Sequence, residues 1–294
     1  MDSTEAQFLE YAVVFEALDV LALAFLFAVV SESVWDVVTG QRKKLGETFA
    51  NGAIAIILAL LERTAYGLIF IVALLLVTPF AVFEIPQGWW TLPLAVLAAD
   101  FTYYWMHRCE HEVRLFWANH SVHHSSPEFN FTTALRISWM DAIIEWVFFV
   151  PMILLGFGLV PTVAGLVVVV AYQSWVHTEK VGRLGWLDQL MNTPSIHRVH
   201  HGSNAQYIDK NYGGILIIWD RIFGTYAPEN ETVKYGITTP IGSQNPFTIN
   251  FREYTTLLHD VRRAESWKSA LGYMFRPPGW QPENSGKSKE NPQP

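Results

Sequence analysis

Eight of the ten histidines in this chain fall into three short motifs. The spacing is HxxxH once and HxxHH twice, and the members are His107 and His111, then His120, His123 and His124, then His197, His200 and His201. Residues three and four positions apart share one face of a helix, so each motif can direct two or three imidazoles at one spot. Neutral imidazole is the commonest metal ligand in proteins. Eight imidazoles exceed what one ion needs, and the pattern therefore predicts a site for two ions.

The identity of the ions follows less directly, because imidazole suits both iron and zinc. Zinc has no redox chemistry and prefers closed tetrahedral sites. A histidine-rich pair without thiolates, placed beside membrane segments, suits iron and oxygen attack on lipid C–H bonds. The sequence thus favours two iron ions. A zinc-dependent lipid hydrolase and a non-catalytic metal-binding membrane scaffold are the alternatives from other functional classes.

Three residues outside the motifs are further candidates for the site. His177 ends an apolar segment and is predicted to be a ninth ligand. Asp100 shares a helical face with His107 and His111, and a carboxylate in a membrane segment is a functional candidate by default. Its alternative role is that of a buried acid hydrogen-bonded to a neighbouring helix. Glu112 follows His111 directly and is either a base beside the ligands or a surface acid. Asp100 and Glu112 are the predicted catalytic residues.

The composition is that of a membrane protein. The chain has 294 residues, of which 51% are hydrophobic and 16% charged, and its mean hydropathy is +0.20. Soluble domains have about a quarter of charged residues. The 12 tryptophans fit side chains that anchor at a membrane interface. The net charge of −7, without a basic stripe, argues against nucleic acid as a partner.

The apolar segments predict an all-α integral membrane protein with about four or five membrane helices. A span needs roughly 20 apolar residues, and the expected segments are Ala12–Val34, Ala65–Phe83, Leu92–Met106, and a hairpin of Ala142–Leu155 and Leu159–Val176. Ala53–Leu61 is expected to be a buried or interfacial helix. The cluster Arg42, Lys43 and Lys44 follows the first span and assigns that end to the cytoplasm. All ten histidines then lie on the cytoplasmic side.

We expect one domain over residues 1–276, with its core at about 92–226. Gly213–Phe223 is apolar but short, and it is predicted to pack under the metal site rather than to span a membrane. Residues 277–294 are rich in Pro, Lys, Glu, Asn and Ser, which predicts a disordered tail.

Together with their flanking residues, the motifs resemble the fatty acid hydroxylase/sterol desaturase superfamily of membrane di-iron oxygenases. The resembling stretches are Asp100–His111, Trp117–His124 and Thr193–Gly202. After His177 the chain is most similar to the alkylglycerol monooxygenase family, in the stretches His177–Glu179, Leu184–Gly185, Asp209–Gly214, Ile217–Thr225 and Tyr235–Gly236.

The resemblance implies an O2-dependent lipid monooxygenase whose two iron ions are held by the eight clustered histidines. Members of the alkylglycerol monooxygenase family hydroxylate the ether-linked carbon of glyceryl ethers, and the resulting hemiacetal collapses to a fatty aldehyde and glycerol. Their external reductant is tetrahydrobiopterin. Glu112 matches an acid that follows the second histidine in that family, whereas Ile196 stands where the family often has another histidine. Hydroxylation or desaturation of a sterol or an acyl chain remains the alternative activity.

Overall fold

The computed structural model describes residues 3–40, 45–63 and 67–282. Over these ranges the chain is helical and forms no strand, with two isolated β-bridges, Met191 to Leu216 and Gly202 to Tyr235. The predicted all-α class is confirmed for the described residues.

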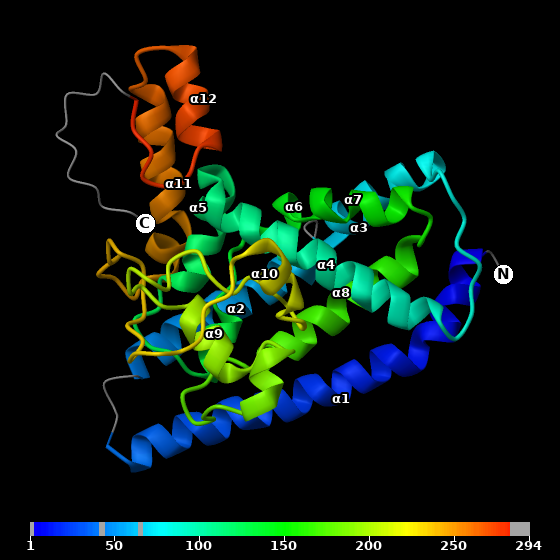
Figure 1. The fold of residues 1–294 in the computed structure, drawn as a ribbon, viewed down its shortest axis with the longest axis horizontal. Helices are drawn as coiled ribbons and strands as arrows, with labels where there is room; N and C mark the ends of the chain where they lie inside the picture. Colours follow the sequence, from blue (N-terminus) through cyan, green and yellow to red (C-terminus); the bar gives the residue numbers. More distant parts are fainter. Residues whose placement is uncertain (1–2, 41–44, 64–66, 283–294) are drawn as a thin grey trace.

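The first helix, α1 (Ser3–Val38), runs along one edge of the molecule (Figure 1) and packs against α8 (Leu159–Ser174). It is longer than the expected span, and its segment Tyr11–Val38 is the one described helix that is long and apolar enough to cross a membrane. Glu32 on this helix is buried and accepts hydrogen bonds from the Thr178 hydroxyl and the Phe131 N–H, at 2.7 and 2.6 Å. The helix is therefore attached to the loop that follows His177.

The next apolar segment is divided after Leu61, as expected, but its second helix is shorter than the expectation. Helix α2 covers Leu45–Leu61, followed by α3 (Gly67–Val77) and the 3-10 turn η3 (Thr78–Phe80). At about 1.5 Å per residue, the 11 residues of α3 cover about half of a bilayer core of roughly 30 Å. The prediction of a full span over Ala65–Phe83 is therefore wrong in its extent, although its first two residues lie outside the described ranges. Pro79 cannot continue the hydrogen-bond ladder, and the helix ends in η3.

Helices α4 (Thr91–Glu112) and α5 (Arg114–His124) carry the first two histidine motifs. Val113 between them is extended, which turns the chain so that α5 folds back on α4. Helix α4 packs closely on α8, where a Cβ on Gly165 would lie 2.6 Å from the Ala95 carbonyl oxygen. A glycine at this position allows the two backbones to approach.

The expected hairpin after residue 141 is present as three helices. They are α6 (Asp141–Ile144), α7 (Trp146–Leu154) and α8, with Gly158 in a positive-φ conformation at the turn. Side chains from α3, α4, α7 and α8 form the main apolar core beneath the site, with Leu74, Ala99, Phe149, Ile153 and Val169 among its members.

The remainder of the chain covers the site. It contains the 3-10 turn η5 (Gly185–Gln189), α9 (Pro194–His200) with the third motif, α10 (Ile218–Phe223), α11 (Pro246–Arg262) and α12 (Trp267–Phe275). Helices α11 and α12 form a protruding pair against α5 (Figure 1). The predicted disorder of residues 277–294 falls largely on 283–294, outside the described residues.

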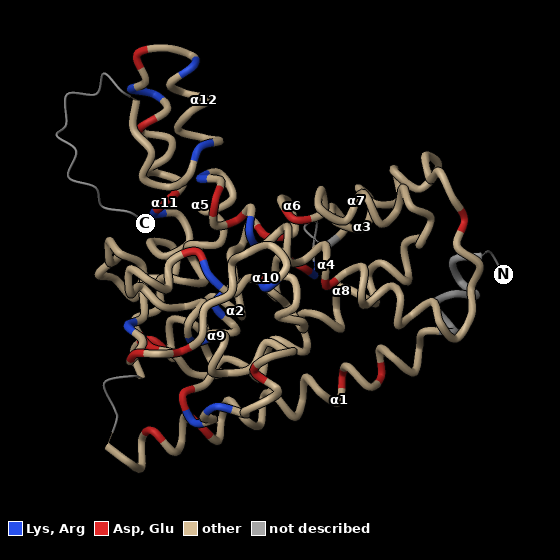
Figure 2. The backbone as a smooth tube through the Cα atoms, viewed as in Figure 1, with Lys and Arg blue, Asp and Glu red and all other residues tan. Residues whose placement is uncertain are grey.

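Charged residues are unevenly distributed (Figure 2). They gather around α9, α11 and α12, while the part of the molecule formed by α3, α7 and α8 carries few. Many large apolar side chains on α1 are exposed, including Leu23 at 68% and Phe27 at 75%.

Candidate metal centre

Nine histidines form two neighbouring groups. Within each group, one ring nitrogen of every histidine lies within 4.8 Å of the corresponding nitrogens of the others. The first group, from α4, α5 and α9, contains His107, His111, His120, His124 and His200. The second group contains His123 from α5, His197 from α9, His201 directly after α9, and His177, which lies three residues after the end of α8. His177 thus lies among the clustered imidazoles, as the sequence predicts, while the exposed His259 on α11 belongs to neither group.

Each HxxHH motif serves both groups. His120 and His124 enter the first group and His123 the second, whereas on α9 His200 enters the first group and His197 and His201 the second. Each motif thus directs two of its imidazoles at one group, and the remaining histidine of each HxxHH motif belongs to the other group. On a helix the i+4 position is rotated by about 40° and the i+3 position by about 60° in the opposite sense, so the two directions diverge. One helix can thereby supply ligands to two adjacent centres.

Backbone carbonyls orient the imidazoles. The Nδ1 atoms of His107, His177 and His200 each lie 2.9 Å from a carbonyl oxygen, of Tyr212, Gln173 and Lys210 respectively. A neutral imidazole that donates from Nδ1 presents a lone pair at Nε2, which is how metal-binding histidines are usually fixed. These contacts select Nε2 as the ligand atom.

The spacing of the Nε2 atoms fits a bound cation. In the second group, the Nε2 atom of His177 lies 3.1 Å from that of His123 and 2.9 Å from that of His197. Nitrogens about 2.1 Å from one ion and 90° apart lie about 3.0 Å from each other. Because the Nδ1 atoms of His177 and His123 face the carbonyls of Gln173 and Arg136, their Nε2 lone pairs oppose each other without a proton between them. A cation removes that repulsion.

The first group supplies a second sign of fit. The Nε2 atoms of His111, His124 and His200 are buried and have no hydrogen-bond partner. A buried polar atom without a partner is uncommon and costs free energy. Burial also lowers the pKa of His124, His200 and His201, so that these rings are neutral and ready to bind a metal at pH 7. Both groups fit metal ions bound by neutral imidazole.

Arg136 connects the second group to α2. It is 1% exposed, and its guanidinium donates to Glu47 and Asn51 on α2, both at 2.9 Å, and to the Ser125 hydroxyl at 2.8 Å. Its own carbonyl faces His123 Nδ1 at 3.3 Å. A buried ion pair therefore fixes the position of a carbonyl that orients one ligand.

Three carboxylates, one buried and two half-buried, lie beside the first group. Glu110, Asp141 and Glu145 have carboxylate oxygens within 4.8 Å of one another, and Glu110 Oε2 lies 3.3 Å from His120 Nδ1. Burial raises the pKa of Glu110 and raises that of Asp141 to about 6. These three acids are not among the candidates that the sequence predicts. The available signal was a pair of carboxylates four residues apart at the start of an apolar segment.

Glu112 lies apart from these groups. Its carboxylate is 43% exposed and pairs with Arg108 Nε at 2.8 Å. The structure thus gives it the surface ion pair that was its alternative role, and its catalytic role stays a prediction.

The hydrogen bonds of Asp100 also indicate a structural role. It is buried on α4 and accepts hydrogen bonds from the Ile215 and Leu216 N–H groups at 2.6 and 3.1 Å, and from Trp219 Nε1 at 2.8 Å. None of these three bonds involves an imidazole. They attach α4 to the segment that follows Tyr212, the residue whose carbonyl orients His107. These contacts agree with the alternative role of Asp100 as a buried, hydrogen-bonded acid. Its partners lie on a loop and on α10 and not on a neighbouring membrane helix.

We expect Asp100→Asn to destabilise the protein by about 2–4 kcal/mol, because an amide nitrogen would face donors that now share two carboxylate oxygens. Thermal unfolding of the detergent-purified protein measures the effect. The matched control is Asp19→Asn, which changes an exposed acid on α1 and should leave the unfolding temperature unchanged. An unchanged unfolding temperature in Asp100→Asn would show that the segment after Tyr212 does not depend on this carboxylate.

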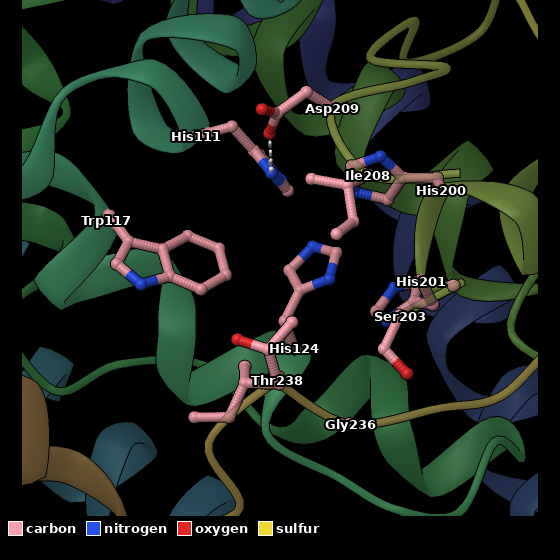
Figure 3. A pocket seen from close by; sticks show the side chains of 12 residues that line it. His111, Trp117, His124, His200, His201, Ser203, Ile208, Asp209, Gly236 and Thr238 are labelled. Atoms are coloured by element: carbon pink, nitrogen blue, oxygen red, sulfur yellow. Dashed lines mark ion pairs between the residues drawn. The ribbon is translucent and has the colours of Figure 1, made fainter. Parts of the chain in front are cut away.

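Two cavities reach the histidines from different sides. A small one of about 40 Å³ is bordered by His111, His124, His200, Trp117 and Asp209 (Figure 3), and Asp209 Oδ1 lies 3.6 Å from His111 Nδ1. Asp209 has a positive φ of 58°. A non-glycine residue in that region signals a conformation imposed by its surroundings, and such residues cluster at functional sites.

The larger cavity encloses about 290 Å³. His120 from the first group and His123 and His177 from the second line one wall, while Leu166 and Val170 from α8 contribute apolar surface. The carboxylates Glu110, Asp141 and Glu145 line it as well. One space therefore contacts both imidazole groups, an acidic surface and an apolar surface.

Comparison with known proteins identifies relatives of this chain. The family model described as fatty acid hydroxylase matches residues 92–225. An alkylglycerol monooxygenase of Xenopus tropicalis is 44% identical over 199 residues, which is 67% of this chain and 43% of that protein. The human alkylglycerol monooxygenase is 42% identical over 219 residues, which is 73% of this chain and 48% of that protein. An ornithine lipid hydroxylase of Rhizobium tropici is 31% identical over 160 residues, 52% of this chain and 48% of that protein.

The chain thus spans less than half the length of these curated relatives. No solved structure gives a significant match. The matched family region contains all nine clustered histidines.

Proposed function

We propose that this chain, whose residues 92–225 match the fatty acid hydroxylase family model, is a membrane-bound di-iron monooxygenase that hydroxylates the ether-linked carbon of an alkylglycerol lipid. One observation carries the proposal: two groups of buried imidazoles share a cavity of about 290 Å³ that also has apolar walls. The substrate class is that printed in the names of relatives at 42–45% identity.

Iron is favoured over zinc by the ligand set. One group offers five imidazoles and the other four, with no thiolate in either. Structural zinc sites are four-coordinate and a catalytic zinc usually has three protein ligands, so five converging imidazoles exceed the need of zinc. Iron bound there would supply the activation of O2 that hydroxylation of an unactivated C–H bond requires. A zinc-dependent hydrolase is the less favoured alternative.

The reaction consumes O2, two electrons and two protons per turnover. One oxygen atom is inserted into the C–H bond beside the ether oxygen, and the other leaves as water. The resulting hemiacetal loses its C–O bond to the glycerol oxygen, which gives a fatty aldehyde and glycerol. The chain holds a single cysteine, Cys109, so it has no cysteine cluster to carry electrons. We assign the electrons to an external donor, with tetrahydrobiopterin as the first candidate.

The two cavities suggest separate routes for the reactants. The larger one, lined by His120, His123 and His177, suits the lipid because it has apolar walls. The smaller one, beside His111 and Trp117, is of a size for O2 or water rather than for a lipid. The carbonyls that face Nδ1 of His107, His177 and His200 leave the Nε2 atoms of these rings available to bind metal ions.

A membrane location is supported by the surface of the helices. Exposed apolar patches beyond a few hundred Å² mark contact with a membrane or another protein, and α1 exposes apolar side chains along most of its length. The region of α3, α7 and α8 is poor in charge (Figure 2). We propose several membrane-embedded helices in this region and a histidine site on the cytoplasmic side, the side assigned to Arg42, Lys43 and Lys44.

The experiment is an assay for fatty aldehyde. Purified, iron-loaded protein receives 1-O-hexadecylglycerol, tetrahydrobiopterin and O2, and the expected result is aldehyde that requires all three. Protein that contains two irons but releases no aldehyde would refute ether cleavage and direct the search to sterol or acyl substrates. Aldehyde formation that persists without O2 would refute the oxygenase mechanism.

A further inference from the structure

One part of the larger cavity is lined by carboxylates that have no role in the proposed reaction at the metal centre. Glu110, Asp141 and Glu145 form an acidic surface there, and the Oε1 atom of Glu110 is buried without a hydrogen-bond partner although its residue is only 1% exposed. A buried carboxylate oxygen without a donor is costly. The unpaired oxygen points to a ligand that donates hydrogen bonds.

The other atoms of the cluster are partly engaged. Asp141 Oδ1 accepts from Asn119 Nδ2 at 2.6 Å, and Asn119 Oδ1 accepts from the Tyr254 hydroxyl at 3.3 Å. This chain of bonds, which begins on α11, holds Asp141 in place at the cavity. The acidic surface is thus built into the fold, with Asn119 and Tyr254 behind it.

The residues of the cavity wall disfavour an anionic head group. Among the described residues that line the cavity, none is lysine or arginine, and four are acids: Glu62, Glu110, Asp141 and Glu145. A phosphate or a fatty-acid carboxylate would find no cationic side chain on this wall. Hydroxyl groups, in contrast, donate readily to carboxylates.

We propose that Glu110, Asp141 and Glu145 form the subsite that binds the two free hydroxyls of a glycerol head group, while Leu58, Leu166 and Val170 contact the alkyl chain. This inference rests on the proposed function, because it takes the alkylglycerol as substrate. The subsite lies beside His120, so a head group bound by the acids places its ether-linked carbon next to the imidazole groups. The carboxylates act as specificity-determining residues.

The test measures equilibrium binding of radiolabelled 1-O-hexadecylglycerol and of its 2,3-di-O-methyl analogue, which cannot donate hydrogen bonds. The full iron-loaded chain should bind the diol about 10-fold or more tightly than the analogue, since a hydrogen bond to a charged group contributes about that factor. Asp141→Asn and Glu145→Gln should each reduce this preference by about 10-fold. Both variants should raise KM for the diol more than they lower kcat.

The controls separate the subsite from the metal centre. Glu84→Gln changes an exposed acid between α3 and α4 and should keep the parent's preference. Iron content should equal that of the parent in all three variants. If the parent prefers the diol but releases no aldehyde, ether cleavage is refuted and the subsite stands.

Four results would overturn the subsite. They are equal binding of diol and analogue by the parent, an unchanged preference in both acid variants, tighter binding of an alkylamine of the same chain length than of the diol, and a third metal ion per chain that Asp141→Asn removes. The last two would assign the acids to an ammonium group or to a metal.

Discussion

The variant His197→Ala is expected to lose activity by at least about 10³-fold and to bind one metal ion instead of two. Changes to residues that only orient a ligand typically cost 10- to 100-fold in activity or metal affinity, and loss of a ligand should cost more. His197 belongs to the group of four, which would be left with three imidazoles. His200→Ala should lose activity to a similar degree but retain more metal, because four imidazoles remain in its group. Elemental analysis and aldehyde release on the same preparations measure both effects.

The matched control is His259→Ala. This histidine lies on α11 with a side chain that is 57% exposed, outside both groups. It should keep the parent's metal content and rate. A His200→Ala protein that turned over lipid at the parent rate would contradict a di-metal mechanism, and binding of metal without any turnover in the parent would support the scaffold alternative.

Arg136→Ala should lower the free energy of unfolding by about 3–5 kcal/mol, since removal of one partner leaves a buried charge unpaired. The stranded group is Glu47, which is 7% exposed and accepts from Arg136 at 2.9 Å. The unfolding temperature in detergent should fall by about 10 °C. Metal content at the four-imidazole group should fall as well, because the Arg136 carbonyl faces His123.

Arg252→Ala, an exposed arginine on α11, controls for loss of a positive charge and should leave stability unchanged. The double variant Arg136→Met and Glu47→Gln should regain part of the lost stability, because neither buried charge remains. An unchanged unfolding temperature for Arg136→Ala would show that the pair contributes nothing to stability.

Much of the fold can be predicted from the sequence because apolar runs bounded by Gly and Pro indicate helices directly. The hairpin that turns at Gly158 and the helix that carries His107 both lie where the pattern predicts them. The extent of α3 was predicted wrongly because the expected span followed the apolar run past Pro79, the residue at which the α-helix gives way to η3. Length along a membrane normal depends on such local breaks.

The histidines could be identified from spacing, but their division between two groups could not. The sequence gives the angle between His120, His123 and His124 on one helix, while the position of α9 opposite it decides which ring joins which centre. The supports of the site come from long-range contacts. Glu110 lies between two recognised ligands in the sequence, yet its meeting with Asp141 depends on how α6 packs. No local pattern encodes that meeting.

The hydrogen bond between α1 and the loop after His177 limits which segments can be exchanged between related proteins to make a chimera. The family match begins at residue 92, but Glu32 accepts from Thr178 and Phe131, and Glu47 pairs with Arg136. A fragment cut at residue 92 would leave donors next to the ligands without their acceptors. The segment that the family model matches is therefore smaller than the segment that must be transplanted together. A working chimera has to keep each acid on α1 and α2 with its own donor.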